Sequence, residues 1–96
     1  MRRFYLVAYD ICEPGRLRKV FRTMRGFGEH LQLSVFQCDL TARARVEMQA
    51  VLEEIIHHDE DKVLIIDLGP SEAGPVKGVE TLGRQSSARP RRSVIV

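Results

Sequence analysis

The 96-residue sequence is 44% hydrophobic and 29% charged, with a net charge of +2, as expected of one small globular domain with a modest core. The charges are segregated along the sequence. Residues 1–28 carry seven basic and two acidic side chains, and residues 81–96 carry four arginines and no acid. Residues 29–80, in contrast, carry four basic and eleven acidic side chains. No apolar run approaches the length that a membrane-spanning helix needs. The short apolar stretch after the basic start is interrupted by Asp10, unlike a signal peptide, so we expect a cytoplasmic protein.

A strand and a basic helix are predicted at the start of the chain. Residues 4–11, FYLVAYDI, form a nearly continuous run of apolar and aromatic residues, which suits a central strand buried on both faces. Glu13-Pro14-Gly15 is a turn signal, and a helix is expected over residues 16–24, ended by Gly26 and Gly28. Its apolar stripe consists of Leu17, Val20, Phe21 and Met24. Arginine and lysine fill the other faces of this helix.

The middle of the sequence predicts one or two strands, a second helix and a further strand. Residues 30–40, HLQLSVFQCDL, alternate apolar and polar side chains at first, so that one long bent strand and two short strands both fit. Thr41 suits the N-cap of a helix that runs to about His57. The apolar stripe of this helix consists of Met48, Val51, Leu52 and Ile55, widened by Ala44 and Ile56. Residues 62–68, KVLIIDL, read as a second strongly apolar strand.

The last third of the sequence has weaker signals. Residues 69–78 hold two prolines and three glycines and are predicted to be a loop, and residues 79–82 are predicted to be a weak edge strand. Residues 84–92 resemble a linker, and the final SVIV would add a strand to a sheet edge, on the same chain or, as we favour, on a partner. The element order indicates an α+β protein with the ferredoxin-like βαββαβ arrangement. We expect this domain to span residues 1–83, followed by a basic tail over residues 84–96.

The spacing of several residues resembles that of the Cas two family of CRISPR-associated proteins. Members have a Tyr-Asp strand end, a basic helix and a Gly…Gln…Ser-Val-Phe segment, which here are Tyr9, Asp10, Arg16, Arg18, Gly28, Gln32, Ser34, Val35 and Phe36. The resemblance covers roughly residues 4–83. It implies a small ferredoxin-like homodimer in which the C-terminal strand pairs with the partner subunit.

The family resemblance implies two functions. In spacer acquisition, a Cas two dimer sits between dimers of the Cas one integrase and binds duplex DNA, and in this role we would expect the chain to be a non-catalytic adaptor. Many members are also described as metal-dependent endonucleases that cut single-stranded RNA or duplex DNA. A third reading, a small regulatory domain that binds a metabolite, has no ligand motif to support it and leaves the segregated charge unexplained.

Asp10 is the candidate catalytic and metal-binding residue. Mg²⁺ often needs only one or two protein carboxylates together with water and phosphate oxygens, and a twofold dimer would supply a second Asp10 if the two strand ends faced each other. The only conceivable further carboxylates are Glu13, Asp39 and Asp67. The alternative is that Asp10 merely caps a turn at the end of a strand.

Other side chains are candidates for support of catalysis or for binding of nucleic acid. Ser34 and Phe36 match family positions near the strand that carries the candidate site, and Tyr9 is a candidate hydrogen-bond donor beside it. His30 stands where the family often has an arginine or another polar residue, and it is a candidate general acid or phosphate contact. Core packing, local hydrogen bonds and an exposed strand start are the alternative explanations for these four residues. Arg16 and Arg18, at the start of the first helix, are the best candidates for phosphate contacts, and the second-rank candidates are Lys77, Arg84, Arg89, Arg91 and Arg92. Aromatic and basic residues do not alternate along the sequence, so stacking of single-stranded bases is not predicted.

Overall fold

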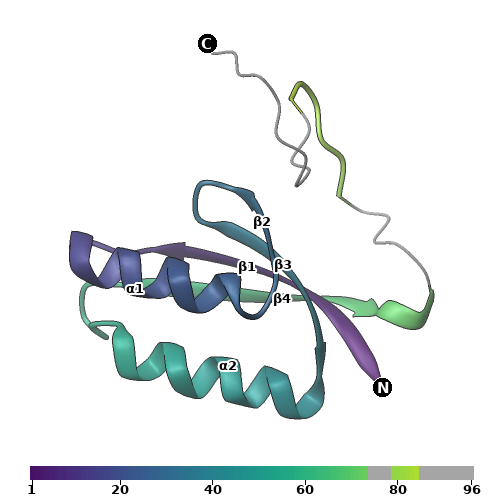
Figure 1. The fold of residues 1–96 in the computed structure, drawn as a ribbon, viewed down its shortest axis with the longest axis horizontal. Coiled ribbons are helices and arrows are strands. Elements are labelled where there is room, and N and C mark those ends of the chain that lie inside the picture. Colours follow the sequence, from purple (N-terminus) through teal and green to yellow (C-terminus); the bar gives the residue numbers. More distant parts are fainter. Residues whose placement is uncertain (74–78, 85–96) are drawn as a thin grey trace.

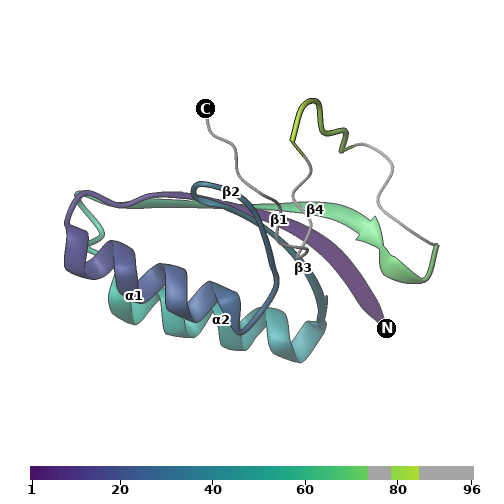
Figure 2. The same ribbon diagram turned by 45° about the horizontal axis from the view of Figure 1, so that its top comes forward.

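A computed structural model describes residues 1–73 and 79–84 of the chain. In chain order its elements are β1 (Arg2–Asp10), α1 (Pro14–Arg25), β2 (Glu29–Gln32), β3 (Val35–Thr41), α2 (Ala42–Ile55), β4 (Lys62–Pro70) and the short 3₁₀ helix η1 (Ser71–Ala73). The four strands form an antiparallel sheet in the order β2-β3-β1-β4, and both helices cover the same face of this sheet (Figures 1 and 2). The predicted ferredoxin-like arrangement is confirmed.

β1 is the central strand, and its two faces have different environments. Tyr5, Val7 and Tyr9 point toward the helices and are buried, whereas the alternate residues, such as Leu6 and Ala8, are only half-buried on the other face. The prediction of burial on both faces is therefore wrong for one chain taken alone. We call the helix-free side of β1, β3 and β4 the open face; within the described ranges no helix covers it (Figure 2).

The core lies between the sheet and the two helices. It is closed by Val20 and Met24 from α1 and by Met48 and Leu52 from α2, as the apolar periodicity of both segments predicts. Val51, which was expected in the second stripe, is exposed instead. None of the helices in the described part of the chain is long and apolar enough to cross a membrane.

Local capping and turn geometry set the limits of the elements. α1 begins at Pro14, two residues before the predicted start, because the Glu13 side chain accepts a hydrogen bond from the Arg16 backbone N–H at 2.7 Å and caps the helix. Thr41 caps α2 as predicted. Two short strands, not one bent strand, follow α1, because the chain turns between them at Leu33, whose φ is +35°.

The C-terminal predictions have different outcomes. Residues 79–82 are not a strand, because they make no backbone ladder with the described strands and a strand without a hydrogen-bonding neighbour has no means of stabilisation. The SVIV segment and most of the predicted tail lie outside the described residues.

Candidate functional site

Asp10 is the last residue of β1 and lies on the open face. It is exposed, and its register partner is Lys62, the first residue of β4. Toward the middle of the same face lie Leu64 and Ile66, which are 49% and 44% exposed. The carboxylate of Asp10 therefore borders an exposed apolar surface.

The three supplementary carboxylates considered from the sequence do not join Asp10. Glu13 is used to cap α1, and the backbone N–H of Arg16 lowers its pKa. Asp39 and Asp67 lie near the opposite end of β1, paired with Arg2 and Arg3 respectively, about 15–20 Å from Asp10 at the usual rise of a strand.

A metal ion at Asp10 would consequently need ligands from outside the described part of this chain. Within residues 1–73 and 79–84 no cluster of three or more His, Cys, Asp or Glu side chains could hold an ion. One exposed carboxylate suits a largely hydrated Mg²⁺, and a second copy of the chain is the simplest source of another.

Asp61 is the centre of a hydrogen-bond network beside Asp10 that the sequence did not predict. Its side chain is 0% exposed and accepts hydrogen bonds from the Arg16 guanidinium at 2.7 and 3.2 Å, from the Cys12 backbone N–H at 2.9 Å and from the His57 backbone N–H at 2.8 Å. The hydrogen bonds from Arg16 have the largest effect and, together with the two backbone N–H groups, hold the pKa of Asp61 far below its usual range. The network joins the loop that follows Asp10 to the loop that precedes β4.

Arg16 belongs to this network and is poorly placed as a phosphate ligand. Its guanidinium also donates to Glu60 Oε1 at 3.0 Å, and the hydrogen bonds to Asp61 raise the pKa of Arg16 still further. The Cys12 thiol donates to the Glu60 backbone carbonyl at 2.9 Å and strengthens the same junction. The local sequence carried no signal for this role, since Arg16 and Asp61 are far apart in the chain.

The predicted supporting residues are brought together, but mainly as packing groups. Phe36 is fully buried, and the Tyr9 ring stacks on it with centroids 6.3 Å apart; burial raises the pKa of the Tyr9 phenol. The Ser34 carbonyl accepts the Tyr9 backbone N–H at 3.1 Å. His30 is exposed, and its Nε2 lies 2.8 Å from the Leu33 carbonyl oxygen, within the β2–β3 turn.

The predicted nucleic-acid contacts divide into three groups. Arg18 and Arg22 are both exposed on α1. Arg22 was not selected from the sequence, although residues four apart on a helix are neighbours and this spacing places Arg22 beside Arg18. Arg84 is exposed near the end of the described chain. Lys77, Arg89, Arg91 and Arg92 lie outside the described residues.

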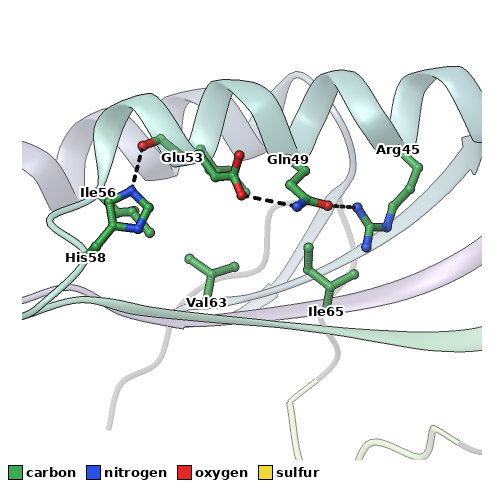
Figure 3. Close-up of a pocket in the computed structure, with 8 residues that line it drawn as sticks. Arg45, Gln49, Glu53, Ile56, His58, Val63 and Ile65 are labelled. Atoms are coloured by element: carbon green, nitrogen blue, oxygen red, sulfur yellow. Dashed lines mark hydrogen bonds between the residues drawn. The ribbon is translucent and has the colours of Figure 1, made fainter.

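A groove runs between α2 and β4, the strand at one edge of the sheet (Figure 3). Its volume is about 310 Å³, and its apolar lining consists of Leu52, Ile56, Val63 and Ile65. Along α2, Arg45 donates to Gln49, which donates to Glu53, at 2.7 and 3.2 Å. A β-strand edge beside an apolar groove can accept an added strand.

A second groove, of about 490 Å³, lies between α1 and the β2–β3 turn. It is lined by Tyr9, Leu17, Arg18, Phe21, Arg22, Leu33 and Ser34. The turn projects from the sheet beside α1 (Figure 1). Apart from the two arginines and Ser34, the lining is apolar or aromatic.

Residues 1–74 of the chain match the family described as CRISPR associated protein Cas2. The chain is 47% identical, over the full length of both proteins, to the CRISPR-associated endoribonuclease Cas2 of Geobacter sulfurreducens. It is 46% identical over 92 residues to the CRISPR-associated endoribonuclease Cas2 1 of Rhodospirillum rubrum, covering 96% of this chain and 89% of that protein.

Solved structures show the same similarity in three dimensions. The Cas2 of Streptococcus pyogenes, solved at pH 6.5, superposes with a TM-score of 0.70 at 32% identity, covering 83% of this chain and 99% of that one. The hypothetical protein TT1823 of Thermus thermophilus superposes with a TM-score of 0.75 at 32% identity, covering 88% and 95% of the two chains.

Proposed function

The chain belongs to the Cas2 family of CRISPR-associated proteins, and from this premise we propose that it acts as a homodimeric, magnesium-dependent endonuclease with RNA as the substrate class. The observation that carries the proposal is the place of Asp10, exposed at the end of the central strand on the rim of the apolar open face. Packing two open faces together would bury their apolar residues, and a twofold axis near the ends of the two β1 strands would bring two Asp10 carboxylates to one seam. RNA is the substrate class given in the names of the two relatives above.

The chemistry follows from two carboxylates that share one seam. Like charges held close together favour a bound cation, and Mg²⁺ supplies an activated water and neutralises charge on the phosphate during hydrolysis. Asp10 of each copy would hold the ion. The Asp61 network holds the loop that directly follows Asp10, so the end of β1 that carries the Asp10 carboxylate is fixed in position.

Spacer acquisition is the second candidate function, in which the dimer binds duplex DNA and bridges Cas one integrase subunits. Two observations favour it. Among the described residues Asp10 has no cluster of further metal ligands, whereas basic residues are exposed on α1. Binding to a phosphate backbone needs only such cations. In this role Asp10 would be dispensable.

The partner subunit would also supply the C-terminal strand in either function. The α2–β4 groove offers an apolar site beside the outer edge of β4, which pairs with no other described strand. The final SVIV segment has the β-branched composition that such an edge accepts.

Cleavage and binding measured side by side test both candidates. Labelled single-stranded RNA and duplex DNA are incubated with Mg²⁺ and either wild type or Asp10→Ala, and binding is followed in EDTA across a salt series. If the nuclease proposal holds, wild type should cleave the RNA, and Asp10→Ala should cleave it no faster than the metal-free background. Asp10→Ala should still bind the strands in a salt-sensitive way.

Asp59→Ala is the matched control, because Asp59 is an exposed aspartate in the α2–β4 loop. It should cleave like wild type. Salt-sensitive duplex binding with no cleavage by any of the three proteins would reject the nuclease and leave the adaptor.

A further inference from the structure

The groove between α1 and the β2–β3 turn has apolar walls that no function above uses. Its walls are Leu17 from α1, Leu33 from the turn and the aromatic side chains of Phe21 and Tyr9. Leu33 is 81% exposed and Leu17 is 38% exposed. Apolar side chains therefore face a concave site whose volume lies in the range of small-molecule pockets.

The rim of this groove is positively charged. Arg18 and Arg22 line it one helical turn apart, and neither forms an ion pair with a side chain in the described part of the chain. Glu13, whose charge acts on Arg18, already caps α1. The two guanidinium groups are thus available to an anionic ligand, in contrast to Arg16.

We propose that this groove binds one unpaired nucleobase of a single-stranded nucleic acid, with the flanking phosphates on Arg18 and Arg22. The inference rests on the proposed function and deepens it, because it assigns a preference for unpaired strands. A nucleotide combines an apolar ring face with a neighbouring negative charge, and the groove offers apolar walls and two cations in the same arrangement. A paired base is hidden in its duplex and could not enter.

The fold explains why the sequence did not reveal this site. Tyr9, Phe21 and Leu33 come from a strand, a helix and a turn that are separate in the sequence. No alternating aromatic and basic pattern is therefore present, although the same residue types meet in space.

The backbone at Leu33 agrees with a functional role for its side chain. A φ of +35° is costly for a branched residue and easy for glycine or asparagine. Strained residues of this kind concentrate at binding sites. Here the strain presents an apolar side chain at the mouth of the groove.

The test compares a short single-stranded RNA with the same strand lacking its central bases, which keeps every phosphate. Binding is measured by fluorescence anisotropy in EDTA, so that no strand is cut. Wild type should bind the abasic strand about tenfold more weakly, the lower range for loss of one stacked base. Leu33→Gly should bind the intact strand as weakly as wild type binds the abasic one, and should bind the abasic strand unchanged.

Two comparisons keep the result specific to the groove. Leu33→Gly relieves the strained φ, so its thermal midpoint should not fall, and lost binding could not be blamed on unfolding. Val46→Gln removes a side chain that is 66% exposed on α2 and should bind both strands like wild type.

The possible failures are distinguishable. Equal wild-type affinity for the intact and abasic strands, with no effect of Leu33→Gly, would overturn the base site and leave only backbone binding. No binding of any strand by wild type would overturn the proposed function, and this inference with it.

Discussion

A buried carboxylate organises the end of the molecule where Asp10 lies. Asp61 has no exposed side-chain surface, and its oxygens are satisfied by Arg16 and by two backbone N–H groups from different loops. A buried charge is tolerated only when it is paired and hydrogen-bonded in this way. The loops on both sides of the β1–β4 end therefore depend on one ionised group.

Stability should respond to acid through Asp61. The pKa of its carboxyl is lowered from the ordinary 3.8 in the folded protein, so its contribution is complete above that value and is lost as the pH falls below it. In urea unfolding from neutral pH to about pH 2, Asp61→Asn should be less stable than wild type at neutral pH and lose less stability toward acid.

Asp59→Asn serves as the control for this experiment, because it removes an exposed charge from the same loop. It should follow the wild-type pH profile. If the Asp61→Asn and wild-type curves ran parallel from neutral to acid, ionised Asp61 would not be a source of stability.

Single residues also show what a sequence can predict. Thr41 was confirmed as a helix cap, because capping depends on the immediate neighbours of a residue. The first strand ends at Asp10, one residue before its predicted end. The role of Arg16 was predicted only from its place on a basic helix. Its actual partners lie beyond α2, and no local pattern carries the information that the two segments meet.

At the scale of elements, the passage from α1 to β3 depends on a close approach of backbones. A Cβ added at Gly28 would lie 2.5 Å from both the Cys38 Sγ and the Gln37 carbonyl oxygen. Cys38 is fully buried, and burial raises the pKa of its thiol to about 11. The glycine lets the chain leave α1 in direct contact with the sheet.

Gly28→Ala should therefore lower the free energy of unfolding by about 1–3 kcal/mol, the usual cost of overpacking. Gly26→Ala is the matched control, since the added Cβ would be 3.4 Å from its nearest neighbour and φ at Gly26 is −82°. Urea unfolding of both variants measures the difference. Equal stability of the two variants would mean that the backbone at Gly28 can move without cost.

The elements were predicted well where one periodicity governs them. The buried positions Val20, Met24, Met48 and Leu52 follow helical spacing, and the structure confirms them. Residues 79–82 were predicted wrongly, because a strand is defined by a neighbour that the local sequence does not specify.

At the scale of the whole molecule, one face of the sheet stays apolar and without a covering layer among the described elements. Leu64 and Ile66 are exposed there, beside the half-buried Leu6 and Ala8. Contiguous apolar surface of this kind marks an interaction site. It is the surface on which the proposed dimer depends.

Ile66→Lys should weaken self-association, because a charge would be buried without a partner at the seam. We expect the dimer dissociation constant to rise by at least about tenfold, which corresponds to about 1.4 kcal/mol, as measured by sedimentation equilibrium. Val46→Lys, on the solvent side of α2, should associate like wild type. A dimer unchanged by Ile66→Lys would place the interface elsewhere.

The central position of β1 has a consequence for synthesis of the chain. β1 is synthesised before β3 and β4, yet it pairs with β3 on one side and with β4 on the other. Its second edge stays unpaired until residues 62–70 have emerged, so a nascent chain shorter than this carries an apolar strand open to pairing with other chains. Asp10 acquires its neighbour Lys62 at the same late step, and the candidate site and the sheet are therefore completed together.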